Sequence, residues 1–532
     1  MKLNKSTSLR SKIIWFDKAL IFLFFLSLHL VFFNINVAEW GDSYRFLRAS
    51  EIVRNFSYPA DEKRPPLFSI ILAVRPNGVE QILWGRAVVL VFSIFLFILF
   101  NSFVSKYVKE RKYQNLALVL FTLNPVLFYW SIRIMSDIPF ALFSLLALYF
   151  VSTWKILDVG RSFLLGFIVG LSILTRFEGY ICFLAVLIGI LFFREKLNLS
   201  FLNPRLFFKH LWKKLPYMLT FMSASFLTIL PYLLFRNPFA SAYLGEPTGR
   251  SYDFKTIWIY VASLAGLFGF VLAPYFIVKG RKVVWEYLAG NVGIFAFLVM
   301  ELVLILIWPA AMPRLFVAIL PFLILLLVLA YSDGAEKKIS KKGLILALCL
   351  IAFFVVSQYF LKLQFLIPNK IYFALLVFAQ FVGLILLFLK RTKAFLLLTF
   401  LSVLSWSFFV VWIQKDIFIS IKNAAQYASL NVDGVVGYND VSSVSDWYLN
   451  YSGTPRANRG FYYNAEVKKN LEFNTLLKSG VDYLLLTNEH NITMTLDLEK
   501  RPYLAIIKEF RYNVDGKDFF AEVVKFNKEW QK

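Results

Sequence analysis

Residues 116–130 read "LALVLFTLNPVLFYW" and contain no charged side chain. A second stretch, "LILALCLIAFFVVSQYF" at residues 344–360, has the same character. Such blocks recur along a chain of 532 residues that is 59% hydrophobic and only 17% charged, whereas soluble domains hold about 25% charged residues. Because a helix needs roughly 20 apolar residues to cross the bilayer hydrocarbon, the sequence predicts a polytopic α-helical membrane protein.

The apolar runs predict about thirteen transmembrane helices by this length criterion. No small-residue cleavage site follows the basic N-terminus "MKLNKSTSLRSK", so the first run is expected to be a retained span. The spans cover roughly residues 13–36, 83–104, 114–131, 138–154, 162–175, 179–193, 215–235, 256–278, 287–308, 315–331, 343–361, 371–389 and 394–413.

The net charge of +24 would favour nucleic acid as a partner in a soluble domain. Here Lys and Arg concentrate in alternate short loops, such as "KYVKERK" at 106–112 and "EKKISKK" at 336–342. The positive-inside rule then places these loops and the N-terminus in the cytoplasm, where anionic lipids attract them. We therefore expect a multi-pass protein of the plasma membrane and no nucleic-acid partner.

The chain changes character at about residue 414, after a transmembrane part that is expected to span 1–413. Residues 432–440, 481–487 and 504–526 alternate in polarity like strands, the last with Asp515-Gly516 at a hairpin turn. A helix closed by glycine is predicted over 465–480. With an odd number of spans before it, 414–532 is expected to form a small extracytoplasmic α/β domain.

The first predicted outer segment, residues 37–82, carries an acid where a helix begins. From Asp42 onward, Phe46, Ala49, Val53 and Phe56 recur at helical spacing, which predicts an interfacial amphipathic helix. Asp42 can serve as a plain N-cap of this helix or as a functional carboxylate.

A second acid, Asp137 in "RIMSDIPF", opens the fourth predicted span at the same membrane face. It too can be an N-cap, since Pro139 follows at an early helical position. Two carboxylates at one depth can instead converge in a single cleft, where one of them orients or deprotonates a hydroxyl nucleophile. Asp42 and Asp137 are therefore the candidate catalytic residues.

The basic residues on the outer side, where the positive-inside rule disfavours them, include Lys63, Arg64, Arg133, Arg176 and Arg314. Each alone can be an interfacial anchor. Together they indicate an anionic ligand, and the planar guanidinium suits phosphate because it donates two hydrogen bonds at once. We expect these five side chains to bind the phosphate of a donor.

Hydroxyl activation beside a bound phosphate in a membrane matches a lipid-phosphate-linked sugar. Expulsion of a lipid phosphate needs no protonating acid, so a base and cations suffice. Trp40 is placed to stack on a sugar ring, and Tyr44, Arg45 and Glu178 are further expected substrate contacts. No glycine-rich phosphate loop for a nucleotide sugar is found in the sequence.

At these residues the sequence resembles the GT-C glycosyltransferases, in the branch of protein O-mannosyltransferases and lipid A aminoarabinose transferases. The resemblance rests on Asp42 with Tyr44, on Arg64-Pro65-Pro66-Leu67, on Asp137 in "SDIPF", on "GLSILTR" at 170–176 and on "PRLFVAILPFLILLL" with Arg314. It implies a GT-C fold, Asp42 as the catalytic base and Arg64 against the donor phosphate. The chain departs from the family at Ser43, where Glu is frequent, and the tail from 414 matches no family motif.

The resemblance implies an inverting transferase that moves one sugar from a polyprenyl-phosphate donor to a lipid, glycan or protein hydroxyl, since the WWD-type motif of oligosaccharyltransferases is missing. A transporter or flippase of lipid-linked glycans and a non-catalytic scaffold are the alternatives.

No cofactor is required by this chemistry, and a divalent cation between Asp42 and Asp137 is an option that we do not favour. Glu301, within the ninth span, is either functional or a protonated helix-packing group. Asp446-Trp447-Tyr448 in the tail can contact an acceptor or belong to a core.

Overall fold

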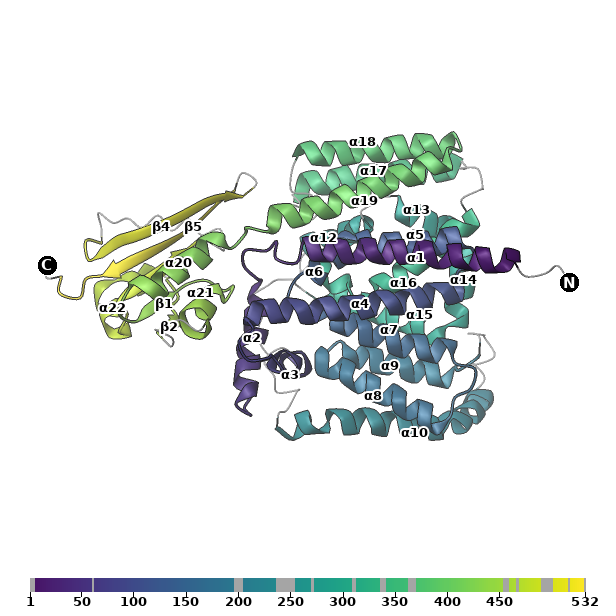
Figure 1. The fold of residues 1–532 in the computed structure, drawn as a ribbon, viewed down its shortest axis with the longest axis horizontal. Coiled ribbons are helices and arrows are strands. Elements are labelled where there is room, and N and C mark those ends of the chain that lie inside the picture. Colours follow the sequence, from purple (N-terminus) through teal and green to yellow (C-terminus); the bar gives the residue numbers. More distant parts are fainter. Residues whose placement is uncertain are drawn as a thin grey trace.

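The computed structural model describes residues 5–59, 62–195, 204–235, 254–268, 272–308, 312–334, 341–361, 370–452, 459–465, 468–488, 501–514 and 517–530. Within these ranges a bundle of long helices lies side by side, and a small sheet with its own helices lies beyond one end of the bundle (Figure 1). The expected combination of an apolar helical bundle with a C-terminal α/β unit is confirmed.

The first half of the bundle consists of α1 (Lys5–Val31), α2 (Gly41–Arg54), α3 (Leu67–Ala73), α4 (Gln81–Tyr107), α5 (Arg111–Leu123), α6 (Pro125–Ser131), α7 (Asp137–Thr153), α8 (Val159–Thr175), α9 (Gly179–Leu191) and α10 (Pro204–Phe235). The second half consists of α12 (Phe254–Gly266), α13 (Ala273–Lys279), α14 (Arg281–Gly290), α15 (Val292–Ile307), the short 3₁₀ turn η2 (Pro313–Phe316), α16 (Leu320–Gly334), α17 (Lys341–Leu361), α18 (Lys370–Phe388) and α19 (Thr392–Gln414).

Each of the thirteen predicted spans overlaps helices among the described residues, but several are broken. The span predicted at 114–131 is two helices, because Pro125 has no N–H to continue α5 and the Asn124 side chain caps α6 by accepting hydrogen bonds from Val126 and Leu127, both at 3.0 Å. The span predicted at 287–308 begins too early, since α14 and α15 meet at 109° around residue 291.

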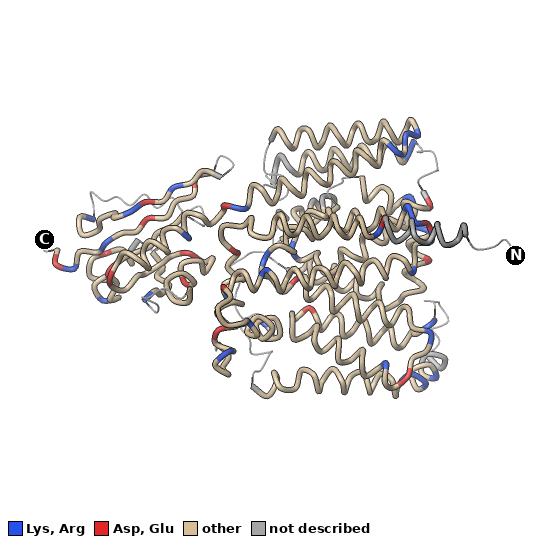
Figure 2. Tube along the Cα trace, viewed as in Figure 1, with Lys and Arg blue, Asp and Glu red and all other residues tan. Residues whose placement is uncertain are grey.

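Four of the described helices are long and apolar enough to cross a membrane, or five if the bent pair α14 and α15 counts as one span. Several apolar helices thus make this a multi-pass membrane protein, while the count of thirteen stays a prediction. Lys and Arg gather at the end of the bundle where the N-terminus lies (Figure 2). That asymmetry is the one expected from the sequence, and the assignment of this end to the cytoplasm also stays a prediction.

The helix predicted after Asp42 is α2, which runs across the direction of α4 at the end of the bundle (Figure 1). Its buried side includes Tyr44, Phe46 and Ala49. The prediction that Phe56 continues this apolar face is wrong, because α2 ends at Arg54 and Phe56 has a positive φ of 55° and a fully exposed side chain.

The C-terminal unit, described here from α20 (Ile419–Asn431) to the last strand, contains a five-stranded sheet in the order β2-β1-β3-β5-β4. Its strands are β1 (Val436–Tyr438), β2 (Gly460–Tyr462), β3 (Tyr483–Thr487), β4 (Leu504–Val514) and β5 (Lys517–Phe526). β1 is parallel to β2 and β3, whereas β5 is antiparallel to β3 and β4. All three predicted strand regions are confirmed, and the predicted Asp515-Gly516 turn lies outside the described residues.

The helix predicted over 465–480 is shorter than expected. It consists of the 3₁₀ turn η4 (Lys468–Leu471) and α22 (Phe473–Ser479), and it ends at Gly480, whose φ of 75° suits a residue without a Cβ. Between β1 and β2 lie α21 (Val444–Asp446) and the π-helical turn η3 (Trp447–Tyr451), which pack against α20. The predicted boundary at 413/414 coincides with the end of α19 and stays a prediction as a domain border.

Candidate active site

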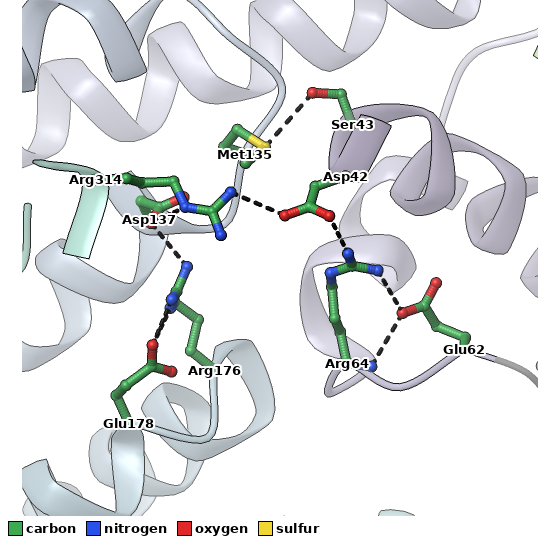
Figure 3. Close-up of polar contacts among 9 residues, drawn as sticks. All are labelled: Asp42, Ser43, Glu62, Arg64, Met135, Asp137, Arg176, Glu178 and Arg314. Carbon is green, nitrogen blue, oxygen red and sulfur yellow. Dashed lines mark hydrogen bonds and ion pairs between the residues drawn. The ribbon is translucent and has the colours of Figure 1, made fainter. Parts of the chain in front are cut away.

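Neither candidate carboxylate caps its helix. α2 begins at Gly41 with Trp40 as the N-cap, and α7 begins at Asp137 with Ser136 as the N-cap. No side chain makes a capping hydrogen bond at either helix start. The N-cap interpretation is therefore wrong for both Asp42 and Asp137, whose side chains turn to arginines instead (Figure 3).

Arg314 joins the two carboxylates. It lies in η2 between α15 and α16, and its Nη1 donates a hydrogen bond of 2.8 Å to Asp42 Oδ2. Its Nε lies 3.6 Å from Asp137 Oδ1, which is an ion pair rather than a hydrogen bond. Figure 3 shows the guanidinium between the two acids. Three segments that are far apart in the sequence thus converge at one place.

Arg64 approaches Asp42 from the stretch just before α3. Its Nη2 donates to Asp42 Oδ1, so both oxygens of Asp42 are held by guanidinium groups. Arg64 is itself positioned by Glu62, whose Oε1 accepts hydrogen bonds from Arg64 Nη1 at 2.9 Å and from the Arg64 backbone N–H at 3.0 Å. The ring of Phe46 lies beneath the guanidinium, 5.1 Å from ring centre to Cζ.

Arg176 completes the network on the side of Asp137. It follows the last residue of α8, and its Nη1 donates a hydrogen bond of 2.7 Å to Asp137 Oδ1. Its Nε and Nη2 both donate to Glu178, at the start of α9. We call the connected set the carboxylate–arginine network: Asp42, Glu62, Arg64, Asp137, Arg176, Glu178 and Arg314.

The electrostatics of the network favour ionised acids. Burial opposes ionisation of Asp42, but the charges of Arg64 and Arg314 outweigh it and hold the pKa of Asp42 well below its ordinary value of 3.8. Burial also raises the pKa of Glu178, but the charge of Arg176 outweighs it, so the pKa of Glu178 is lowered as well. Asp42 therefore carries a proton-accepting carboxylate that its arginines keep weakly basic.

The network still has unused hydrogen-bonding capacity. Asp137 Oδ2 and Arg314 Nε are buried and have no hydrogen-bond partner among the described residues. The Asp42 side chain keeps 29% of its surface exposed, whereas Asp137 keeps 4%. A ligand can therefore reach Asp42 and compete for its arginines.

Arg133 lies outside the network in a different environment. It is fully buried in the turn between α6 and α7, and its Nη2 donates a long hydrogen bond of 3.4 Å to the Gln414 carbonyl. Its Nε and Nη1 meet no acceptor among the described residues. The guanidinium lies over the rings of Tyr129 and Trp40, at 4.5 and 5.8 Å. A buried cation without a carboxylate is a candidate anion-binding group.

The remaining predicted residues take other positions. Lys63 is half-buried beside Arg64, and its predicted role at the donor phosphate stays a prediction. Trp40 donates to the Tyr129 hydroxyl at 2.9 Å and packs on Trp130 and Phe418. A sugar contact of Trp40 stays a prediction.

Tyr44 and Arg45 point to the C-terminal unit rather than into the network. Tyr44 is 1% exposed, accepts a hydrogen bond from the Glu39 backbone and packs on Trp447 and Tyr448. Arg45 Nε lies 3.4 Å from Ser443 Oγ. This placement packs Tyr44 against the C-terminal unit, and the predicted substrate contacts of both residues stay predictions.

Two acids were missed in the sequence. Glu62 is almost fully buried against Arg64, although in "DEKR" it resembles an ordinary solvated charge. Glu39 is fully buried and accepts a hydrogen bond of 2.7 Å from Arg86 Nε in α4. The signal that was available for Glu39 is its place directly after an apolar run, three residues before Asp42.

The structure gives a metal little support. Among the described residues, no three His, Cys, Asp or Glu side chains are grouped to hold an ion, and the position between Asp42 and Asp137 contains Arg314.

Glu301 of α15 is 2% exposed, and its Oε1 has no hydrogen-bond partner in the described part of the chain. The choice between its two interpretations stays open.

Solved structures share this architecture. ArnT from Cupriavidus metallidurans in the apo state matches with a TM-score of 0.57 at 14% identity, covering 94% of this chain and 97% of that one. The same enzyme bound to undecaprenyl phosphate matches with a TM-score of 0.57 at 13% identity, over 95% and 97% of the two chains. The archaeal oligosaccharyltransferase AglB from Archaeoglobus fulgidus, in complex with an inhibitory peptide and a dolichol-phosphate, matches with a TM-score of 0.51 at 12% identity, over 95% and 74%.

These likenesses confirm that the chain has the GT-C fold expected from the resemblance. No protein-family model matches the sequence, and no curated protein matches it. At such low identities the comparison establishes the fold alone.

Proposed function

We propose that the protein is an integral-membrane glycosyltransferase that moves one sugar from a polyprenyl-phosphate donor to a hydroxyl acceptor on the outer face of the membrane. The observation that supports this most strongly is that Arg64, from the same segment as Asp42, and Arg314, far away in the sequence, both meet the Asp42 carboxylate. The shared fold with ArnT, which is solved bound to undecaprenyl phosphate, supports the choice of donor class.

Asp42 is the proposed base. The acceptor oxygen attacks the anomeric carbon, the bond from that carbon to the phosphate oxygen breaks, and the acceptor proton passes to Asp42. The electron pair of the broken bond leaves with the polyprenyl phosphate. Attack from the face opposite the leaving group inverts the anomeric centre.

Arg64 and Arg314 are the proposed phosphate ligands. In the structure both guanidinium groups are engaged with Asp42, which lowers its pKa and makes it a weak base. A bound phosphate would draw part of their charge away, because guanidinium groups bind phosphate through paired hydrogen bonds. The pKa of Asp42 would then rise, so donor binding itself would prepare the base for the reaction.

Asp137 and Arg176 have positioning roles in this proposal. Arg176 holds Asp137, and Asp137 in turn faces the Nε of Arg314. Arg133 is proposed as a further phosphate ligand, since two of its nitrogens lack acceptors among the described residues. Lys63 is retained as a weaker candidate from its place beside Arg64.

The experiment is a comparison of Asp42→Asn with Asp433→Asn, which removes an acid whose side chain is 82% exposed in the C-terminal unit. Mass spectrometry of cell-envelope glycans should find the added sugar missing with Asp42→Asn and present with Asp433→Asn, at equal amounts of membrane-inserted protein. Sugar transfer that survives Asp42→Asn undiminished would reject Asp42 as the base. A transporter would leave the sugar attached but change the side of the membrane on which the lipid-linked glycan accumulates.

A further inference from the structure

A cavity of about 590 Å³ lies between the first outer segment and the C-terminal unit, apart from the carboxylate–arginine network. Its wall combines residues 34–37 after α1, the start of α4, one side of α20 and the turn η3. The volume falls within the range of about 300–1,000 Å³ that is usual for small-molecule sites. None of the residues proposed above for catalysis or phosphate binding lines it.

The charges around this cavity balance. Arg86 reaches its wall but is already paired with Glu39, which lies buried behind it. Lys422 donates a hydrogen bond of 2.8 Å to the Val37 carbonyl, and Glu80 at the start of α4 supplies an opposing charge. Two cations and two carboxylates leave no net charge, so a neutral ligand fits better than an anionic one.

The rest of the lining is rich in amides and hydroxyls. Asn36 is 3% exposed, and its Nδ2 donates to the Ile132 carbonyl at 3.1 Å. Its Oδ1 is buried and accepts no hydrogen bond from any described residue. Asn36 is thus part of the polar wall, held in place by the Ile132 carbonyl. Gln426 and Ser429 of α20 add further polar groups to the same wall.

Aromatic side chains complete the cavity. Trp447 and Tyr448 of η3 line it, and both also pack on Tyr44 of α2, with ring centres 5.8 and 6.1 Å apart. Sugars bind where hydroxyl-matching amides lie beside aromatic surface, since the ring carbons are apolar and the hydroxyls are not. Because Tyr44 and Asp42 lie on the same helix, the cavity is joined to the proposed base through α2.

We infer that this cavity binds a neutral carbohydrate, namely a part of the acceptor that lies away from the reacting hydroxyl. The identification of that carbohydrate as acceptor rests on the proposed function. The carbohydrate-binding property rests on the cavity alone. The tail residues Trp447 and Tyr448 then combine the two roles weighed from the sequence, since they pack on α2 and also line the binding wall.

The test uses the full-length protein in detergent on an array of neutral and anionic oligosaccharides. The wild-type protein should bind to the neutral oligosaccharides of the array. Gln426→Trp, which fills the cavity, should weaken that binding by at least about tenfold, and Gln426→Ala by roughly threefold. Asn431→Trp is the matched control, because it adds the same bulk at an exposed position of α20 outside the cavity lining. In cells, Gln426→Trp should lower the amount of sugar transferred.

Binding of undecaprenyl phosphate separates the two proposals and reports that each variant is folded. Gln426→Trp should bind this lipid as wild type does. The inference is overturned if wild type retains no neutral oligosaccharide, if only anionic ones bind, or if Gln426→Trp binds the neutral ones unchanged. Neutral oligosaccharide binding that depends on Gln426, in a protein that does not bind undecaprenyl phosphate, would support the cavity and reject the proposed donor.

Discussion

Glu39 and Asp42 lie three residues apart and both pair with arginine, yet their surroundings differ. Glu39 is fully buried, and all three guanidinium nitrogens of its partner Arg86 donate hydrogen bonds. Nε donates to Glu39, Nη1 to the Asn34 side chain and Nη2 to the Asn36 carbonyl. Asp42 is 29% exposed and is shared between Arg64 and Arg314. A closed, satisfied pair holds two segments together, whereas a shared and accessible pair can exchange its acid for a ligand.

The largest expected effect is the loss of stability when the buried Glu39–Arg86 pair is broken. Arg86→Met should lower the free energy of unfolding by about 3–5 kcal/mol, because Glu39 would remain charged and buried without a partner. The measurement is thermal unfolding of the detergent-solubilised protein.

Arg45→Met is the control, since Arg45 is half-buried and contacts a hydroxyl rather than an acid, so it should change stability far less. The double change Glu39→Gln with Arg86→Met should recover part of the loss. If Arg86→Met were as stable as wild type, the contrast between the two pairs would disappear.

Changes to the arginines that share Asp42 should reduce activity rather than stability. Arg314→Met should reduce sugar transfer by roughly 10²–10³-fold, since it removes a cation placed where phosphate charge develops. Stability should change little, because Asp42 keeps Arg64 and Asp137 keeps Arg176. Arg314→Lys keeps the charge without the planar fork and should restore only part of the activity. Loss of folding with Arg314→Met would place Arg314 with Arg86 as a structural residue.

Glu62→Gln sharpens the comparison at a smaller scale. Glu62 orients Arg64 through the guanidinium and the backbone N–H, so its loss should weaken donor binding by roughly three- to tenfold without abolishing transfer. The readout is the affinity for undecaprenyl phosphate. Glu51→Gln is a suitable control, because Glu51 pairs with Arg75 elsewhere on the same segment. Equal losses in both variants would deny Glu62 its specific role.

The smallest expected effect is on thermal stability at low pH. The folded pKa of Asp42 is lowered, so its contribution to stability is present above the unfolded value of 3.8 and is lost as the pH falls toward the folded pKa. Between about pH 5 and pH 3 the melting temperature of wild type should therefore fall by a few degrees more than that of Asp42→Asn. Parallel curves for the two proteins would show that Asp42 is not held by its arginines.

Much of this architecture was predictable because long apolar runs in the sequence indicate membrane-spanning helices. The positions of the helices followed from composition, and the choice of Asp42, Arg64 and Arg314 as candidate site residues followed from their place in the chain and from resemblance. Helix breaks were harder to place: Pro125 was visible, but the bend between α14 and α15 has no proline.

Contacts between distant segments were not predictable. The Glu39–Arg86 pair joins two residues that are 47 positions apart, and no feature of the sequence around either one indicates its partner. The same holds for the tail. A Cβ on Gly41 would lie 2.5 Å from the Ser442 carbonyl oxygen, so the C-terminal unit meets the start of α2 at a point that only glycine permits. The contact of Tyr44 with Trp447 lies at the same junction.

Arg64 and Arg314 should exchange Asp42 for the donor phosphate, and the affinity of Asp42→Asn for undecaprenyl phosphate tests this most directly. Without the carboxylate both guanidinium groups are available, so the variant should bind the lipid at least as tightly as wild type while transferring no sugar. Binding as weak as that of Arg314→Met, or sugar transfer at the wild-type rate, would contradict the exchange.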